Sequence, residues 1–314
     1  MSLSLGATNF GYIYLGSAKI GEAYLGSVKV YGSTPVDPYN PLGLPPYTIR
    51  LKFNDGVTPT FEKGTAAQVS SSPNVWDLTY QDTDWSFLLY QQSDLTEVLG
   101  ANSSDVVNMR YLFYQCSSLT SVPLFDTSTV TNMNSMFREC SVIASVPLFN
   151  TGIVTDMEYL FDRCSALAYV PLFDTSHVTI MSYMFDRCHA LTSVPLFNTS
   201  SVTKMGYMFN GCIALTSVPL LDTSNVTNLS ALLSGCSELT SVPLFNTSKA
   251  THVGSMCFGC RKVESGALAL YQQMSSQATP PSNHSDCFRN CGSDTTSGRA
   301  ELAQIPSSWG GNGS

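Results

Sequence analysis

The chain has 314 residues, of which 43% are hydrophobic and 12% are charged, with a net charge of −8. This length suits two or three structural units, and the lack of a basic excess argues against nucleic acid as a partner. No apolar run approaches the ~20 residues that a membrane-spanning helix needs, so we expect no membrane insertion. A polar surface with few charges favours contacts with carbohydrate or protein.

Residues 1–32 predict two short β-hairpins. Tyr-Leu-Gly-Ser occurs twice, at 14–17 and at 24–27, and each copy is followed by a short alternating run. Such hairpins are too small to form a core, so we expect them to pair with another chain or to favour a homo-oligomer. The candidate anchor residues are Tyr14, Leu15, Tyr24, Leu25 and Tyr31. The first residues lack the basic start and apolar stretch of a signal peptide, so export by the usual route is not expected.

Residues 33–46 contain five prolines and one glycine, which predicts an extended linker. Residues 47–94 then predict a small β domain that forms an N-terminal cap for the unit beginning at residue 95. The alternating run Thr48–Phe53 and the turn residues after it carry this interpretation.

Residues 95–263 repeat with a fixed period of 24, which predicts a solenoid of about seven stacked coils. Within each coil, L-x-x-V-x-L indicates a short strand with alternate residues facing inward. Val130, Met133, Met136 and Phe137 follow at helical spacing and indicate one or two turns of helix. The fold class is therefore mainly β with short helices, in a right-handed leucine-rich-repeat-like solenoid.

One cysteine per coil occupies the same position, and this structural column ends each repeat. Seven cysteines cannot all pair, so a file of buried free thiols is favoured over disulfides. The Thr and Asp/Asn columns predict side chains that satisfy the backbone of turns. The cysteines of the column are Cys116, Cys140, Cys164, Cys188, Cys212, Cys236 and Cys260.

Residues 264–314 predict a C-terminal cap that contains a helix, because an open solenoid end exposes core and strand edges. Cys257, Cys260, Cys287 and Cys291 have a spacing that zinc sites use, but most of them fall on repeat columns. A cap disulfide is a further alternative. The chain has four histidines and lacks a phosphate-binding loop or a nucleophile elbow. We therefore predict no enzyme, no metal and no cofactor.

A candidate binding surface lies in the variable positions of the coils. Tyrosines occupy one column in three consecutive coils, and Asp-Arg pairs lie beside two of them, which are residue types favoured at interaction sites and sugar platforms. The alternative is that the tyrosines cover the coil and pack on one another. The candidate ligand-binding residues are Tyr159, Tyr183, Tyr207, Asp162, Arg163, Asp186, Arg187 and His177.

The coil resembles the repeat of BspA-like leucine-rich-repeat bacterial surface proteins, in a 24-residue variant. FDTS-x-V-T-x-M followed by MF-x-x-C, as in Phe173 to Cys188, carries the resemblance, which runs from Leu95 to Lys262. The last full coils depart from it at Leu229 and Cys257. The resemblance implies a surface-exposed, adhesive or receptor-binding role without an enzyme activity.

The first 32 residues are similar to N-terminal segments of phage and prophage structural proteins from gut Bacteroidales, in which YLGS-x-K-[IV]-YG recurs. The resulting hypothesis is a fibre-like virion component at the virion surface. It would bind a host surface glycan or protein and contact other virion proteins through residues 1–32. The alternative is an extracellular, BspA-like adhesin of the bacterial cell surface. A hydrolase is disfavoured, because Asp162 and Asp186 lie on a ridge one coil apart and each precedes an arginine.

Overall fold

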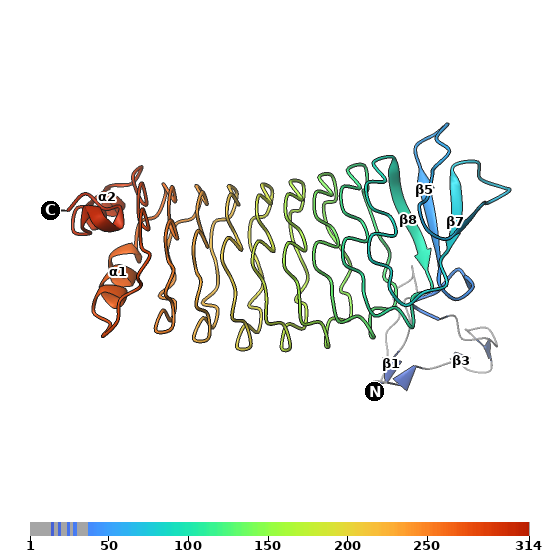
Figure 1. Cartoon of the computed structure of the whole chain (residues 1–314), viewed down its shortest axis with the longest axis horizontal. Coiled ribbons are helices and arrows are strands. Elements are labelled where there is room, and N and C mark those ends of the chain that lie inside the picture. The colour runs from blue at the N-terminus through green and yellow to red at the C-terminus, as the bar shows by residue number, and fades with distance from the viewer. Residues whose placement is uncertain (1–13, 16–17, 20–23, 26–27, 30–36, 314) are drawn as a thin grey trace.

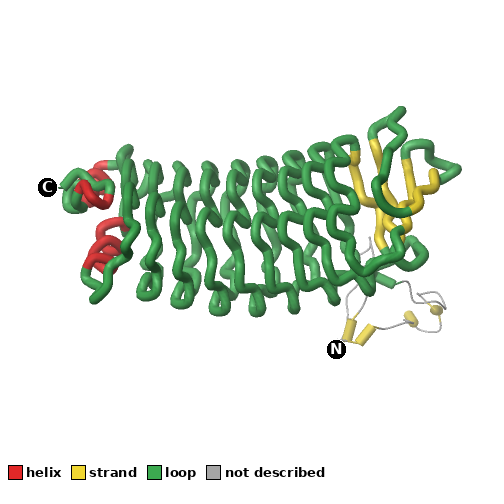
Figure 2. The backbone as a smooth tube through the Cα atoms, viewed as in Figure 1, coloured by secondary structure: helices red, strands yellow, loops and turns green. Residues whose placement is uncertain are grey.

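The computed structural model describes residues 14–15, 18–19, 24–25, 28–29 and 37–313. Stacked coils form an elongated body with a small sheet at one end and two helices at the other (Figure 1). The chain is mainly β in character with few short helices. Most of the coil backbone forms turns and isolated bridges, and the regular elements lie near the ends (Figure 2).

Two antiparallel pairs lie in the N-terminal segment, at the predicted hairpins. β1 (Tyr14–Leu15) pairs with β2 (Ala18–Lys19), and β3 (Tyr24–Leu25) pairs with β4 (Val28–Lys29). Each strand has two residues, in keeping with the short sequence runs. The predicted anchor residue Tyr31 lies outside the described residues.

A four-stranded antiparallel sheet precedes the coils. Its strand order is β6 (Thr65–Gln68), β7 (Val75–Thr79), β5 (Thr48–Phe53) and β8 (Leu95–Ala101). β8 pairs with β5 and is also joined to the next coil by a parallel bridge at Glu97. The last strand of the sheet is thus also the first strand of the stack, which joins the two parts without a free edge between them.

Parallel bridges at equivalent positions hold the coils in register. One unbroken series of eight bridges runs from Asp84 to Asn283, and all but the last join residues 24 apart. The stack therefore begins before residue 95, and the predicted number of about seven coils is too low. The series passes through Asp84, Asn108, Asn132, Asp156, Ile180, Lys204, Asn228, His252 and Asn283.

The segment predicted to be helical is a chain of turns. The N–H groups of Ser135 and Phe137 donate to the next coil, at 2.9 and 3.0 Å, whereas those of Met136 and Arg138 donate three residues back. Ser135 and Glu139 have left-handed backbone, with φ of 57° and 63°, which a right-handed helix excludes. The buried residues have helical spacing, but every second N–H group donates to the next coil and not along a helix.

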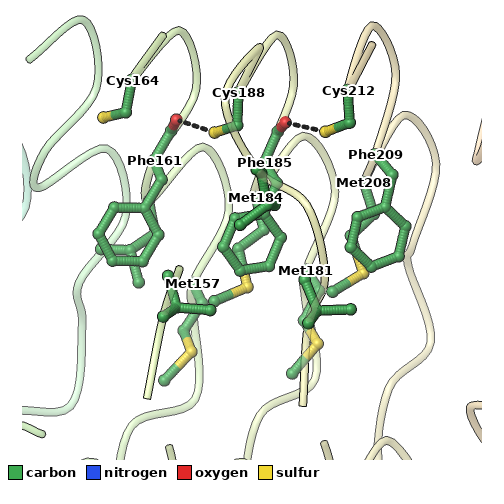
Figure 3. Packing of buried hydrophobic residues seen from close by; sticks show 14 of the residues in the cluster. Met157, Phe161, Cys164, Met181, Met184, Phe185, Cys188, Met208, Phe209 and Cys212 are labelled. Carbon is green, nitrogen blue, oxygen red and sulfur yellow. Dashed lines mark hydrogen bonds between the residues drawn. The ribbon is translucent and has the colours of Figure 1, made fainter. Parts of the chain in front are cut away.

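The core is a set of files that run through the stack, as Figure 3 shows. Phe161, Phe185 and Phe209 are stacked at centroid distances of 5.7 and 5.8 Å. The thiol of Cys188 donates to the carbonyl oxygen of Phe161 in the preceding coil, at 3.1 Å. All ten cysteines are free and buried, and burial raises the pKa of the Cys188 thiol well above its ordinary value.

Turn residues join the coils on the outside. Thr151 Oγ1 donates to the carbonyl oxygen of Asp174 in the next coil, at 2.8 Å, and the carboxylate of Asp174 accepts from the N–H of Ser176. These contacts recur along the stack. The Thr and Asp/Asn columns therefore satisfy backbone groups that no regular element would satisfy.

The C-terminal end carries the two helices. α1 (Ala267–Ser275) and α2 (Thr296–Leu302) contact each other, and the short 3₁₀ helix η1 (Ser307–Trp309) follows. Leu270 and Met274 of α1 are buried in the same hydrophobic core as the coils. The helices thereby cover apolar side chains that the last coil would otherwise expose.

Candidate binding face

Tyr159, Tyr183 and Tyr207 form a continuous stack along three coils. Successive ring centroids are 4.6 Å apart, with interplanar angles of 13° and 8°. The rings are partly exposed, but their inner faces are covered by each other. The stack therefore offers ring edges and phenol hydroxyls to a ligand, in place of the open ring faces of a sugar platform.

Burial between neighbouring tyrosines raises the pKa of the Tyr183 hydroxyl to about 12. The hydroxyl is thus protonated at neutral pH and can donate as well as accept a hydrogen bond.

Arg138 closes the N-terminal end of the tyrosine stack. Its guanidinium lies 4.7 Å from the ring centroid of Tyr159 and 5.6 Å from that of Tyr114. Its Nε is 2.8 Å from Oδ2 of Asp162. This position combines cation–π contacts with an ion pair. At the other end, Ala231 follows Tyr207 in the column, so no aromatic ring covers the outer face of Tyr207.

Asp162 and Asp186 are buried, with exposed fractions of 2% and 7%. The prediction that they lie on a ridge and contact a ligand is therefore wrong. They lie in the column that also holds the half-buried Arg138 and Asn210. The Asn210 amide donates to Asp186 Oδ1 at 2.7 Å, whereas Asp162 Oδ1 has no hydrogen-bond partner.

The two buried carboxyl groups are electrostatically unfavourable when both are charged. Desolvation is the main cause that raises the pKa of Asp162 from 3.8 to about 6, and the nearby Asp186 adds to it. The Arg138 and Arg163 charges act in the opposite direction without cancelling the shift. Burial also raises the pKa of Asp186. This pair is a structural feature beneath the face.

Arg163 and Arg187, the two arginines of the predicted site, are exposed. They lie in the column that directly follows that of Asp162 and Asp186. Arg163 Nη1 donates to Glu139 Oε1 at 3.2 Å, whereas Arg187 has no ion pair within residues 37–313. His177 lies in another segment of the coil, the exposed turn after Thr175, where its ring bonds Ser176. The structure thus stacks the three tyrosines on one another, leaves the two arginines exposed in a separate column, and sets His177 in a different part of the coil.

Four residues that contribute to this face were not singled out from the sequence. Arg138 and Tyr114 belong to the column of Asp162, and Glu139 and Gln115 belong to the column of Arg163. The Gln115 amide donates to Glu139 Oε2 at 2.8 Å, which extends the polar ladder toward the N-terminal end. The signal for these four residues is the 24-residue period itself, because stacking makes residues 24 apart into neighbours.

The described part of the chain has few accessible reactive side chains. The ten cysteines are buried, and burial raises the pKa of the Cys257, Cys260 and Cys291 thiols. Within residues 37–313, no group of three or more His, Cys, Asp or Glu side chains is arranged to hold a metal ion. None of the helices described is long and apolar enough to cross a membrane.

The fold defines a repeat protein built from stacked 24-residue coils. Two overlapping segments, residues 83–190 and 155–269, match the family described as "Mycoplasma protein of unknown function, DUF285", and together they span more than half of the chain. The chain belongs to this family. No curated protein matches it.

Among solved structures, a leucine-rich repeat protein from Eubacterium ventriosum is similar at 18% sequence identity, with a TM-score of 0.40. The alignment covers 64% of this chain and 63% of the other, so the chain spans less than two thirds of that protein's length.

The buried carboxyl pair predicts that stability falls as pH rises. The Asp162 carboxyl has an ordinary pKa of 3.8 when unfolded and about 6 when folded, so the folded state favours the protonated form. Its contribution, up to about 3 kcal/mol, is present below pH 3.8 and is lost as pH rises through 6. Urea denaturation between pH 4 and 8 measures this change.

Asp162→Asn should flatten this pH dependence and raise the stability at pH 8, because the neutral amide replaces a buried charge. The matched control is Asp222→Asn, an exposed turn position at which neighbouring coils carry Asn198 and Asn246. It should leave the pH profile of the wild type almost unchanged. Equal profiles for wild type and Asp162→Asn would contradict this account.

Proposed function

We propose that this chain is a non-enzymatic binding protein whose tyrosine stack contacts a surface glycan or protein. The observation that carries the proposal is the row of stacked phenol groups of Tyr159, Tyr183 and Tyr207, in coils that also expose Arg163 and Arg187. A rigid file of hydroxyls, with exposed guanidinium groups in the same coils, suits the hydroxyls and carboxylates of a glycan, or a polar protein surface.

The rigidity of the stack supports this role. Each tyrosine ring is held by its neighbours, and Arg138 holds the first ring from the other side. Little side-chain entropy is then lost when a partner binds, which is the advantage of a preorganised surface. Aromatic and Arg side chains are also the types enriched at binding hot spots.

We further propose a virion component as the biological setting, with the N-terminal hairpins as the assembly segment. Support comes from β1 to β4, whose two-residue strands are too short to be stable alone and gain from pairing with other chains. In this setting the coils face outward toward the host cell. The alternative setting is a bacterial surface adhesin, in which the same face binds a partner from the surface of the producing cell.

Replacement of Tyr183 tests the proposed face. In a screen of the full chain against a glycan array and a panel of host surface proteins, Tyr183→Ala should weaken binding at least about tenfold, because it removes the middle ring of the stack. The control is Tyr169→Ala, which removes a tyrosine that is 59% exposed in a different column. Binding that survives Tyr183→Ala, or that both variants weaken equally, would sink the proposed face.

The setting is tested by locating the protein and deleting residues 1–32. The virion proposal expects antibodies against the coils to label purified particles, and expects the deletion to abolish incorporation into them. Labelling of the bacterial surface without labelling of particles favours the adhesin. Incorporation that persists after the deletion would refute the anchor role of the hairpins.

A further inference from the structure

A second surface of the coils carries five exposed leucines in one file. Between 52% and 62% of each of these side chains is exposed, although the neighbouring Val and Phe are buried. We refer to Leu148, Leu172, Leu196, Leu220 and Leu244 as the leucine stripe. Single exposed leucines are common on proteins, but a file in five consecutive coils forms a continuous apolar surface.

The backbone places these leucines outward. In the central coil, the Phe197 N–H donates to the Pro195 carbonyl at 3.0 Å, which closes a three-residue turn with Leu196 at its tip. Equivalent bonds close the turns around the other four leucines, from Phe149, Phe173, Leu221 and Phe245. The strand pattern in the sequence predicted an inward leucine, and this turn is the reason that it is wrong. The stripe is therefore a repeated feature of the coil.

The leucine stripe is free of charge, although the whole chain has a net charge of −8. Half-buried prolines lie next to the leucines, and uncharged residues occupy the positions before them in each coil. Asp174 and Asp222 are the acidic residues that directly follow the turns of the five coils, alternating with asparagines. Two such surfaces can therefore approach each other with little like-charge repulsion.

The continuity of the stripe suits an interface. Contiguous apolar patches of a few hundred Å² or more on a soluble protein commonly mark interaction sites, and a stable interface buries about 800 Å² on each partner. Five exposed leucines with their prolines supply the apolar centre, and the flanking Ser and Thr columns supply a polar rim. Tyr39, Leu148 and Leu172 line a pocket of about 340 Å³ at one end, and both leucines stay exposed beside it.

The spacing of the stripe selects its partner. Stacked coils place equivalent side chains about 4.8 Å apart, whereas an extended peptide presents side chains on one face about every 6.6 Å. A surface with the spacing of the coils can interdigitate with all five leucines, whereas an extended peptide falls out of step with them. We propose that the leucine stripe is a two-fold interface with a second copy of this chain, in which Leu196 lies opposite Leu196 of the partner subunit. This dimer is independent of the function proposed for the tyrosine stack.

Charged residues in the stripe test the interface. Sedimentation equilibrium of the full chain should give twice the mass for the wild type that it gives for the double variant Leu196→Asp/Leu220→Asp. The matched control is Val142→Asp/Ile213→Asp, which changes two side chains of 44% and 47% exposure outside the stripe and should keep the wild-type mass. Circular dichroism checks that each variant is folded.

A cysteine cross-link supplies a second measurement. The native thiols are all buried, so Leu196→Cys adds a single reactive thiol to the described surface. Mild oxidation should convert this variant to a disulfide-linked dimer, whereas Ile213→Cys should stay uncrosslinked.

A monomeric wild type, an unchanged mass in the stripe variant, or equal cross-linking at both positions would overturn the dimer. Assembly through residues 1–32 alone would leave the mass insensitive to the stripe variant and would thus be recognised. Because the tyrosine stack is unaltered in these variants, binding through it provides a separate readout.

Discussion

Hydrogen bonds between each coil and the next are the interaction on which the rest of this structure depends. The N–H groups of Met157, Tyr159 and Phe161 donate to carbonyl oxygens of the following coil at 3.1, 3.1 and 2.9 Å. A buried backbone group left without a partner costs about 1–3 kcal/mol, so the bonded segments of neighbouring coils must stay in phase. The longer step from His252 to Asn283 contains the helix α1, and the bonds between the coils continue past it, as from the Cys257 N–H to the Cys287 carbonyl oxygen at 2.8 Å.

This register turns each position of the repeat into a file of identical neighbours. Apolar files gain from it, since Phe185 stacks on rings from both adjacent coils and Cys188 bonds the coil before it. A file of like charges is destabilised by the same register, and the raised pKa values of the adjacent Asp162 and Asp186 carboxyl groups reflect this. The same rule builds both proposed surfaces, because a tyrosine or leucine repeated every 24 residues becomes a continuous stripe. The two stripes lie in different segments of the coil.

The sequence was most informative about features that the period alone determines. Coil length, the burial of the cysteine file and the turn roles of Thr and Asp follow from a residue type that recurs at one position. The prediction of a helix in each coil was wrong. Met133, Met136 and Phe137 have helical spacing, but the backbone at Ser135 is left-handed. Exposure of Leu148 and burial of Asp162 depend on how neighbouring segments of the coil turn and cover one another, which the residue pattern does not encode.

Removal of one whole coil tests the central role of the register most directly. Deletion of residues 189–212 joins equivalent positions of two coils, so we expect the shortened chain to fold cooperatively with an unchanged circular dichroism spectrum. Deletion of residues 189–200 takes out half a coil, leaves hydrogen-bonding groups out of phase, and should prevent native folding. Thermal denaturation of the two variants side by side compares them. Equal stability of the two shortened chains would contradict an account based on register.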